Sequence, residues 1–230
     1  MIESLRRVAS KTLYVNRQKI LSLAEEKKGC NFLDIGCGGG EFTLDFARKI
    51  GASNIYGVEI SKTKIIEAKK RGIITKRADA NKKLPFKDKF FDVILCNQVA
   101  EHLFDPDTLF EEIYRIMKDN GYAIVSVPNL ASLHNRILLL LGFHPTSISP
   151  STRFAFGNPD RGRIIYPFER HITAFSPRAL KEMLEHYGFR VEMHGSGFYP
   201  FSGGISCSLS RIFPTLSVLL IAKVRKRSPA

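Results

Sequence analysis

The chain has 230 residues, of which 44% are hydrophobic and 25% are charged. This length and composition are typical of a folded globular domain and exclude a disordered tail, a fibrous repeat and a polytopic membrane protein. The 35 Lys and Arg residues outnumber the 22 Asp and Glu residues and give a net charge of +13, which favours an anionic partner such as nucleic acid, a charged metabolite or a lipid surface, although a solvated lysine-rich surface explains it equally well.

Short apolar runs alternate with amphipathic segments along most of the chain. Residues 4–28 are charged with spaced apolar positions and predict one or two leading helices, an N-terminal cap over residues 1–28. The expected strands are 31–35, 54–60, 73–77, 91–96, 122–127, 189–193 and 216–224. The expected helices lie over 42–50, from Ser61 to Gly72, from Asp105 to Asn120-Gly121, and from Ser176 to Gly188. This alternation predicts an α/β protein with a mainly parallel sheet.

Residues 129–175 interrupt the alternation. They hold one helix-like run, 137–141, followed by an irregular segment rich in Pro, Gly, Arg and aromatic residues. Long insertions after a sheet strand are typical of lids and binding loops, so we expect one domain over 1–230 with 129–175 as a lid on the substrate site. The run 137–141 is apolar all round, which is typical of a helix packed in a core; a hydrophobic lid over a lipid-like substrate is the alternative.

The four cysteines, at 30, 37, 96 and 207, lack zinc-knuckle spacing, and the chain is too long for a disulfide-framed miniprotein. The first residues carry charges throughout and do not resemble a signal peptide. The most apolar runs, 137–141 and 216–222, are far shorter than the about 20 residues that cross a bilayer. We therefore expect reduced thiols in a soluble, cytoplasmic protein, whose oligomeric state stays open.

The strongest motif is FLDIGCGGGEF, in which a strand runs into glycines and then a helix. Gly36 and Gly38 fit the first two positions of a dinucleotide fingerprint, but the third falls on Glu41. Together with Asp34, that acid would repel a pyrophosphate, because like charges 4 Å apart cost about 4 kcal/mol at an effective dielectric constant of ~20. No Gly-Lys-Ser/Thr follows, which excludes a P-loop. The turn thus favours a neutral or cationic ligand, and S-adenosylmethionine, with its ammonium and sulfonium groups and no phosphate, fits.

Glu59 supports a nucleoside ligand. It ends the second expected strand, 23 residues after Gly36, where an acidic side chain can accept hydrogen bonds from both ribose hydroxyls. NAD sites use the same device, so Glu59 indicates a nucleoside and not one particular cofactor. Asp79, after the third strand, is placed to hold an adenine amine.

The segments DIGCGGG, VEIS, ADANKKLPFKDKFFDVILCNQVAEHL and YRIMKDNGYAIVSVPN together resemble a class I S-adenosylmethionine-dependent methyltransferase of the UbiE/methyltransferase type 11 kind. The resemblance is dense over residues 30–130 and looser over 170–225. It implies a Rossmann-like fold: a seven-stranded, mostly parallel sheet with an antiparallel last strand and helices on both faces.

The residues expected to bind S-adenosylmethionine are Tyr14, Asp34, Gly36, Cys37, Gly38, Glu59, Ile60, Asp79, Ala80, Asn97, Gln98 and Val99. The resemblance implies that 36–38 line the methionine part, that 79–80 contact the adenine edge, and that 97–99 border the methionine and the methyl group. Ile60 would pack on adenine, and Tyr14 would close over the cofactor. Cys37 is assigned no redox chemistry.

Methyl transfer is an in-line displacement with an already activated leaving group, so positioning of the nucleophile can suffice. If a general base takes part, His102 is the candidate, since it follows the fourth strand; a solvated or helix-capping histidine is the alternative. Glu101, His102, Asp105 and Asp107 could form a metal site, but Asp105 is better used as a helix cap, so no metal is expected.

The residues expected to face the methyl acceptor are His134, Arg136, Tyr166, Arg170 and His171. Arginines suit carboxylate or phosphate, so a small or lipid-linked anionic metabolite is the leading acceptor. Enzymes that methylate base amines typically carry an Asn/Asp-Pro-Pro-aromatic motif after the fourth strand. Residues 97–100 are Asn-Gln-Val-Ala, so the sequence does not support that class of substrate. RNA modification and cofactor binding without methyl transfer stay open as alternatives. Peripheral membrane contact through the insertion or the basic cluster 223–227 also stays open.

Overall fold

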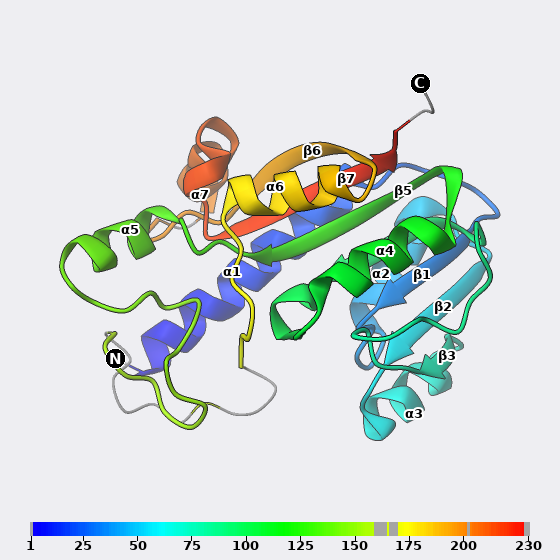
Figure 1. Ribbon diagram of the computed structural model, residues 1–230, viewed down its shortest axis with the longest axis horizontal. Coiled ribbons are helices and arrows are strands. Elements are labelled where there is room, and N and C mark those ends of the chain that lie inside the picture. The colour runs from blue at the N-terminus through cyan, green and yellow to red at the C-terminus, as the bar shows by residue number, and fades with distance from the viewer. Residues whose placement is uncertain (1, 159–164, 166–169, 202, 228–230) are drawn as a thin grey trace.

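A computed structural model of the chain describes residues 2–158, 165, 170–201 and 203–227. Its centre is a seven-stranded sheet in the order β3-β2-β1-β4-β5-β7-β6 (Figure 1). The strands are β1 (Asn31–Ile35), β2 (Asn54–Glu59), β3 (Ile74–Arg77), β4 (Phe91–Asn97), β5 (Met117–Pro128), β6 (Phe189–Ser196) and β7 (Leu219–Lys226). Neighbours among β1 to β5 pair in parallel, whereas β7 is antiparallel to both β5 and β6. The predicted Rossmann-like sheet with an antiparallel last strand is confirmed.

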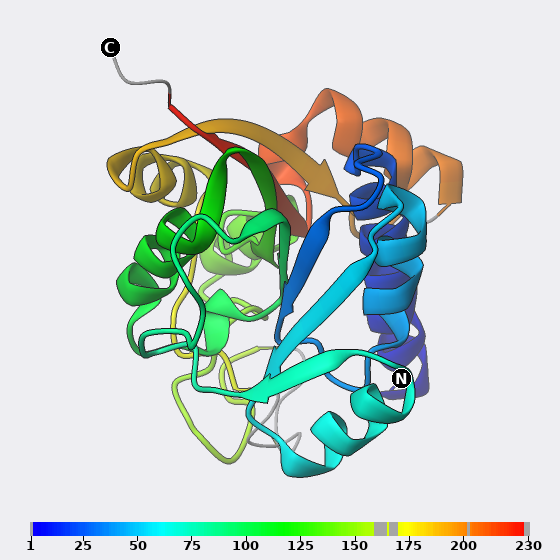
Figure 2. The same cartoon turned by 90° about the vertical axis from the view of Figure 1, so that its right-hand side faces the viewer.

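Helices cover both faces of the sheet. They are α1 (Ile2–Leu23), α2 (Glu41–Ile50), α3 (Lys62–Lys70), α4 (Pro106–Ile116), α5 (Leu133–Leu140), α6 (Pro177–His186) and α7 (Gly203–Ile212), with 3₁₀ turns at Ala100–His102 and Pro214–Leu216. Figure 2 shows the blue helices α1 and α2 on one side of the sheet and the green α4 and yellow α6 on the other. Among the described residues, no helix is both long and apolar enough to span a membrane.

Strand β4 lies at the centre and contributes to a core on each face. Ile94 and Cys96 pack in the core under α4 and α6, whereas Val93 and Leu95 pack in the core under α1 and α2. All four are fully buried. Successive side chains of a strand point to opposite faces, so a continuous apolar run is what a strand covered on both sides requires.

Helix α4 begins as predicted but ends early. The Asp105 carboxylate accepts a hydrogen bond from the Thr108 N–H at 3.0 Å, which caps the first turn. The helix ends at Ile116, not at Asn120-Gly121, because residues 117–121 already belong to β5 and shift its register against β4. A Cβ on Gly121 would lie 2.9 Å from the Asp92 carbonyl oxygen. Glycine is therefore needed for close approach to β4, and it does not stop the helix.

Helix α7 is not predicted from the sequence, and the expected strand 216–224 begins only at Leu219. The helix has an inverted pattern of burial: Ser206 and Ser210 are its buried residues, whereas Ile205 and Ile212 are 62% and 64% exposed. The Ser206 hydroxyl accepts a hydrogen bond from the Phe198 N–H at 2.7 Å. A segment that buries serines and exposes isoleucines gives no conventional amphipathic signal.

Helix α5 shows the same inversion. The run 137–141, expected in a core, is exposed: Leu140 is 86% and Leu141 65% exposed. The buried residue of α5 is Asn135. Its Nδ2 donates to the Asn129 carbonyl, and its Oδ1 accepts from the Thr146 N–H. The polar anchoring of Asn135 sets the orientation of the helix and leaves its leucines facing outward.

Candidate functional site

The candidate site lies where β1, β2 and β4 end beside one another. Gly36, Gly38 and Gly40 follow β1 with φ angles of 76°, 54° and 90°, which glycine adopts far more readily than other residues. A Cβ on Gly36 would lie 2.4 Å from Val99 Cγ2. The turn after β1 therefore packs directly against the segment after β4, at the point in an open α/β sheet where ligands typically bind.

The Glu59 carboxylate faces this turn. Its Oε2 accepts a hydrogen bond from the Gly38 N–H at 3.0 Å, and its Oε1 accepts from the N–H groups of Ile60 at 2.8 Å and Ser61 at 2.9 Å. In a dinucleotide site, N–H groups of such a turn bind phosphate. Here the Gly38 N–H already has a carboxylate acceptor, so the turn disfavours a diphosphate and favours a cation.

The two acids expected to repel a diphosphate act differently. Asp34 is buried under the turn, where it accepts a 2.6 Å hydrogen bond from the Thr43 hydroxyl. Burial raises the pKa of Asp34 to about 7. Glu41 forms an exposed ion pair with Arg71 at 2.6 Å. Asp34 thus holds the turn against α2 through Thr43, and the carboxylate that binds a backbone N–H of the turn is that of Glu59.

Cys37 and Ile60 differ in what they offer a ligand. The Cys37 side chain is buried against Ala68 and Ile73, and burial raises the pKa of its thiol to about 12. The residue therefore offers its backbone and not a reactive sulfur. Ile60, by contrast, is 59% exposed just after β2 and presents apolar surface.

The end of β4 is tied to β5 and to α1. Gln98 has φ +57°, an uncommon conformation for a residue with a side chain, and its N–H donates to the Ser126 carbonyl at 2.8 Å. The Asn97 Oδ1 accepts from Asn16 Nδ2 at 3.0 Å, and Asn16 also donates to the Ser126 hydroxyl at 3.2 Å. Asn16 is fully buried. Sequence reasoning missed it, although a lone asparagine within the apolar stripe of α1 was a visible signal.

Tyr14 and Asp79 border the same end of the sheet. Tyr14 is 63% exposed and lies one helical turn before Arg17, whose guanidinium sits 5.1 Å from the centre of the Phe42 ring at the start of α2. Asp79 accepts hydrogen bonds from the Asn81 N–H and side chain, and the backbone bond, the larger cause, lowers the pKa of its carboxyl. The Asp79 carboxylate is therefore ionised beside Ala80.

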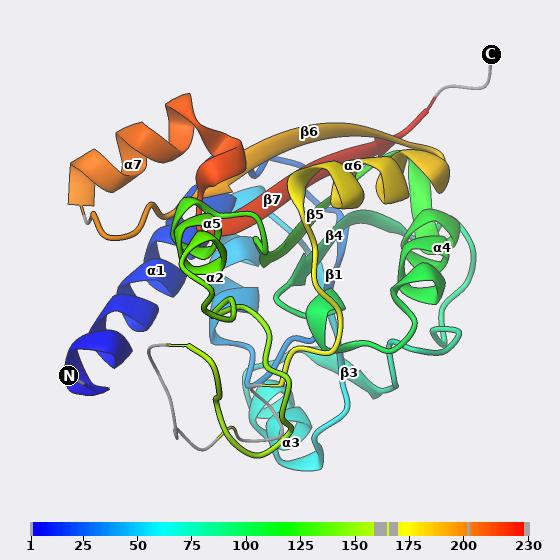
Figure 3. The ribbon, with the colours of Figure 1, turned by 60° about the vertical axis from the view of Figure 1, so that its left-hand side comes forward.

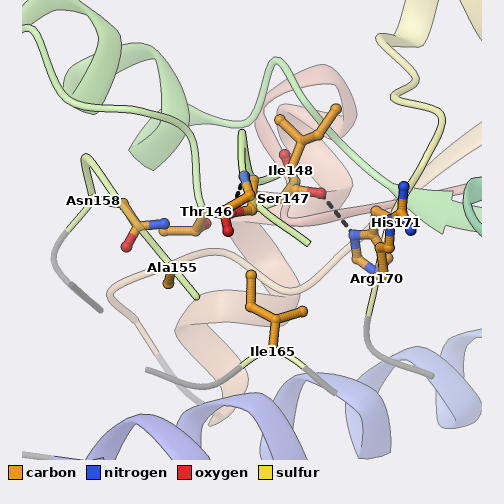
Figure 4. Close-up of a pocket in the computed structure, with 10 residues that line it drawn as sticks. Thr146, Ser147, Ile148, Ala155, Asn158, Ile165, Arg170 and His171 are labelled. Carbon is orange, nitrogen blue, oxygen red and sulfur yellow. Dashed lines mark hydrogen bonds between the residues drawn. The ribbon is translucent and has the colours of Figure 1, made fainter. Parts of the chain in front are cut away.

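A second polar cluster follows β4 and contains Glu101, His102 and His171, each with a ligand atom within 4.8 Å of the others. The His102 Nδ1 lies 2.8 Å from the Arg170 carbonyl, and the His171 Nδ1 lies 2.6 Å from the Ser147 carbonyl (Figure 4). The structure thus brings three of the predicted residues, His102, Arg170 and His171, to one place.

Glu101 is the residue of this cluster that sequence reasoning left without a role. It is 1% exposed, and neither carboxylate oxygen has a hydrogen-bond partner among the described residues. Burial raises the pKa of its carboxyl to about 8. The aspartates once grouped with it are used elsewhere, Asp105 as the cap of α4 and Asp107 as the acceptor of a 2.6 Å hydrogen bond from the Tyr187 hydroxyl.

The other predicted acceptor residues do not join the cluster. His134 lies 3.1 Å from the Thr146 hydroxyl and contacts the Tyr199 ring, and burial lowers its pKa to about 4. Arg136 donates to the Ala131 carbonyl at 2.7 Å. Both stabilise the surroundings of α5. Tyr166 lies outside the described residues.

A cavity of about 90 Å³ lies beside His171 and is lined by residues of the segment 146–158 together with Ile165 and Arg170 (Figure 4). Small-molecule sites usually measure roughly 300–1,000 Å³. The cavity is therefore too small to hold a metabolite by itself.

Comparison with known proteins identifies the fold and the activity. The family model described as a methyltransferase domain matches residues 7–194. The chain belongs to this family. The methyltransferase is 31% identical over 186 residues to a demethylmenaquinone methyltransferase of Lactobacillus johnsonii, which covers 76% of this chain and 73% of that protein. This chain is also 32% identical over 128 residues to a ubiquinone biosynthesis O-methyltransferase of Pelagibacter ubique. That match covers 54% of this chain and 52% of the relative, so the matched region spans about half of the relative.

Among solved structures, the methyltransferase resembles an S-adenosylmethionine-dependent methyltransferase of Thermotoga maritima, described as a possible histamine N-methyltransferase. The TM-score is 0.64 at 22% identity, with 98% of this chain and 96% of that chain covered, and this likeness concerns the fold. Family membership makes the chain an S-adenosylmethionine-dependent methyltransferase, with S-adenosylmethionine as its cofactor. The anionic turn at Glu59 fits a sulfonium compound that lacks phosphate.

Proposed function

We propose that this methyltransferase methylates an ionisable hydroxyl of a small or lipid-linked apolar metabolite. The observation that carries the proposal is the inverted burial of α5 and α7, which place their leucines and isoleucines outward at the same end of the molecule (Figure 3). Exposed apolar surface of this kind usually marks a site for an apolar ligand, a protein or a membrane. The names of two relatives, which refer to menaquinone and ubiquinone, support an apolar ring compound with a lipid tail.

Two contacts connect the apolar helices with the end of β4. Ser147 joins α5 to the polar cluster, since its hydroxyl accepts from Asn135 at 3.1 Å and its carbonyl lies 2.6 Å from the His171 ring nitrogen. The rings of His134 and Tyr199 meet at 5.5 Å and bring α5 beside the segment before α7. The insertion 129–175 would thereby act as a lid with an apolar outer part and a polar inner end.

In this proposal the cofactor supplies an electrophilic methyl group on a sulfonium. Glu59 would accept hydrogen bonds from the ribose hydroxyls, and Ile60 would pack on adenine. The Asp79 carboxylate, with Ala80 beside it, would contact the adenine edge. The turn at 36–38 and the segment 97–99 would hold the methionine part, with Tyr14 over it. The resemblance to the family implies these roles, and the hydrogen bond between Glu59 and the Gly38 N–H supports the first of them.

The cluster at the end of β4 would receive the accepting hydroxyl. His102 is the candidate to take its proton, because hydrogen bonding of Nδ1 to the Arg170 carbonyl fixes the tautomer whose Nε2 carries a lone pair. Arg170 would add positive charge for an anionic acceptor. The hydroxyl oxygen would then attack the methyl carbon as the carbon–sulfur bond breaks.

RNA modification is a second candidate, favoured by where the basic residues lie. Residues 62–89 hold 11 Lys and Arg against 3 Asp and Glu. An open groove of about 700 Å³ is lined by basic side chains of this region, Lys76, Lys83 and Lys87, and by the aromatic rings of Tyr56, Phe86 and Phe90. Aromatic rings between lysines suit stacked bases on a phosphate backbone.

One experiment separates the two candidates. Purified protein is incubated with methyl-labelled S-adenosylmethionine and with separated lipids, small polar metabolites and RNA from the source cells. Label in the lipid or apolar fraction supports the proposal. Label in RNA, with binding that weakens steeply as salt rises, supports the alternative. No label in any fraction would leave a protein that binds the cofactor without transfer and would contradict both.

A further inference from the structure

Helices α5 and α7 are each anchored to the protein by a buried polar side chain. Asn135 of α5 donates to the Asn129 carbonyl and accepts from the Thr146 N–H, and Ser206 of α7 accepts from the Phe198 N–H. Turning either helix to bury its apolar side would break these hydrogen bonds and leave buried polar groups unsatisfied, which is costly. The outward orientation of the apolar side chains is therefore a stable feature of the fold.

The exposed apolar side chains of 137–143 and 199–213 form a surface that we call the apolar end. Among the described residues, 19 large apolar side chains are exposed, of which five lie in 137–143 and five in 199–213. Figure 3 shows α5 and α7 at one end of the molecule, and the 5.5 Å contact between the His134 and Tyr199 rings joins the two segments. More than half of the exposed apolar side chains thus gather in one region, as they do at an interaction surface.

The segments that form the apolar end carry positive charge only. No Asp or Glu occurs in 129–158 or in 194–217, whereas Arg136 of α5 and Arg211 of α7 are exposed. Helices that lie in the interface of an anionic membrane combine leucine, isoleucine and phenylalanine with basic residues in this way. The negative surface potential of such a membrane attracts the arginines, and the apolar side chains enter the boundary between headgroups and acyl chains.

The basic cluster at the end of β7 is a poorer candidate for such a contact, because its cations already have acidic partners. Lys223 and Arg225 both pair with Glu25, and Lys226 pairs with Asp119 at 3.2 Å. Figure 1 shows the end of β7 on the side of the molecule opposite α5. Charge and apolar surface therefore coincide at the apolar end and not at the end of β7.

We infer that the apolar end docks on the surface of an anionic phospholipid bilayer. The apolar side chains come from the outward faces of two separate helices, and insertion into a fluid boundary does not require the shape complementarity that a folded partner would need. This inference rests on the proposed function for its purpose, since a lipid-linked acceptor resides in the bilayer and α5 belongs to the proposed lid. The docking itself requires neither acceptor nor cofactor, so it is measured without them.

The test is co-sedimentation of the purified chain with vesicles. One set of vesicles holds equal parts of phosphatidylcholine and phosphatidylglycerol, and the other holds phosphatidylcholine alone. The expected result is saturable binding to the anionic vesicles that weakens as salt rises, and much weaker binding to the neutral ones.

Two pairs of variants locate the contact. Ile205→Asn/Ile212→Asn should weaken binding to the anionic vesicles at least about tenfold, because two apolar side chains no longer leave water. The matched control is Ile66→Asn/Ile74→Asn, which changes two exposed isoleucines of α3 and β3, far from α7 in Figure 1. Arg211→Gln should weaken binding about fivefold. Lys70→Gln, which also removes a cation from the last turn of a helix, should change it less than about twofold.

Circular dichroism and S-adenosylmethionine binding confirm that each variant is folded. Equal losses in a variant and its control would overturn the docking surface, because binding would then not depend on the apolar end. A dimer that Ile205→Asn/Ile212→Asn dissociates, without vesicle binding, would overturn it in favour of a second copy of the chain. Methylation of a tailed quinol without vesicle binding would overturn the docking alone. Vesicle binding as expected, with no methyl transfer to any lipid or apolar metabolite, would support the docking and count against the proposed function.

Discussion

The carboxylate of Glu59 accepts a hydrogen bond from the Gly38 N–H at 3.0 Å. One side chain at the end of β2 thereby occupies the backbone donor that, in a related nucleotide-binding turn, would hold a phosphate. Three of the about four acceptor positions of this carboxylate are used by the N–H groups of Gly38, Ile60 and Ser61, so about one remains for a ribose hydroxyl. This single contact explains why a glycine-rich turn of dinucleotide type suits a sulfonium nucleoside.

Replacing Glu59 by Gln should weaken S-adenosylmethionine binding about 10- to 100-fold. The amide keeps the shape of the side chain but loses the charge and one acceptor, and hydrogen bonds to charged groups contribute about 1.5–3 kcal/mol. Calorimetric titration measures the affinity. Glu26→Gln is the control, because Glu26 forms an exposed ion pair with Lys28 between α1 and β1 and its loss should change the affinity little. Equal affinities for wild type and the Glu59 variant would refute the ribose role.

Asp34 should make folding stability depend on pH. Its folded pKa is raised to about 7, whereas an unfolded aspartate titrates near about 3.9. Between these values the folded chain holds a proton that the unfolded chain has released, so stability falls as pH rises through this window. Asp34→Asn removes the titration, and its urea-unfolding free energy should vary less from about pH 4 to pH 7 than that of wild type. Asp45→Asn, at an exposed ion pair, should follow wild type; parallel curves for all three proteins would contradict the assignment.

Asn16 should contribute strongly to stability. Changing it to Ala leaves its partners at the ends of β4 and β5 without their donor, and an unsatisfied buried polar group costs about 1–3 kcal/mol. Denaturant unfolding measures the loss. Asn54→Ala, which removes an exposed hydrogen bond to Asn31, should cost less than about 0.5 kcal/mol. Equal effects in the two variants would mean that Asn16 does not anchor α1.

The exposed leucines of α5 should matter for a long-tailed acceptor and not for a short one. The double variant Leu140→Asn/Leu141→Asn should lower kcat/KM for a quinol with an isoprenoid tail about tenfold, because contact with a buried leucine contributes about 1.5–3 kcal/mol. Stability and S-adenosylmethionine affinity should not change. Ile66→Asn removes an exposed apolar side chain of α3 and serves as control. An equal loss for tailed and tailless acceptors would exclude an apolar docking role.

The strands of the sheet, the glycine turn, the position of Glu59 at the end of β2 and the Asp105 cap could be predicted from the sequence, because each has a signal in residues close together in the chain. The orientations of α5 and α7 were not predictable, because the buried Asn135 and Ser206 find their partners only after folding. The meeting of His102 with His171 also depends on how the insertion returns to β4. The early end of α4 follows from the close packing of Gly121 on β4, which no local pattern reveals.

The most direct measurement is a parallel calorimetric titration of the purified wild-type chain with S-adenosylmethionine and with NAD. The account predicts saturable one-to-one binding of the sulfonium compound and no detectable heat from the dinucleotide. Saturable binding of NAD, or no binding of S-adenosylmethionine, would contradict it.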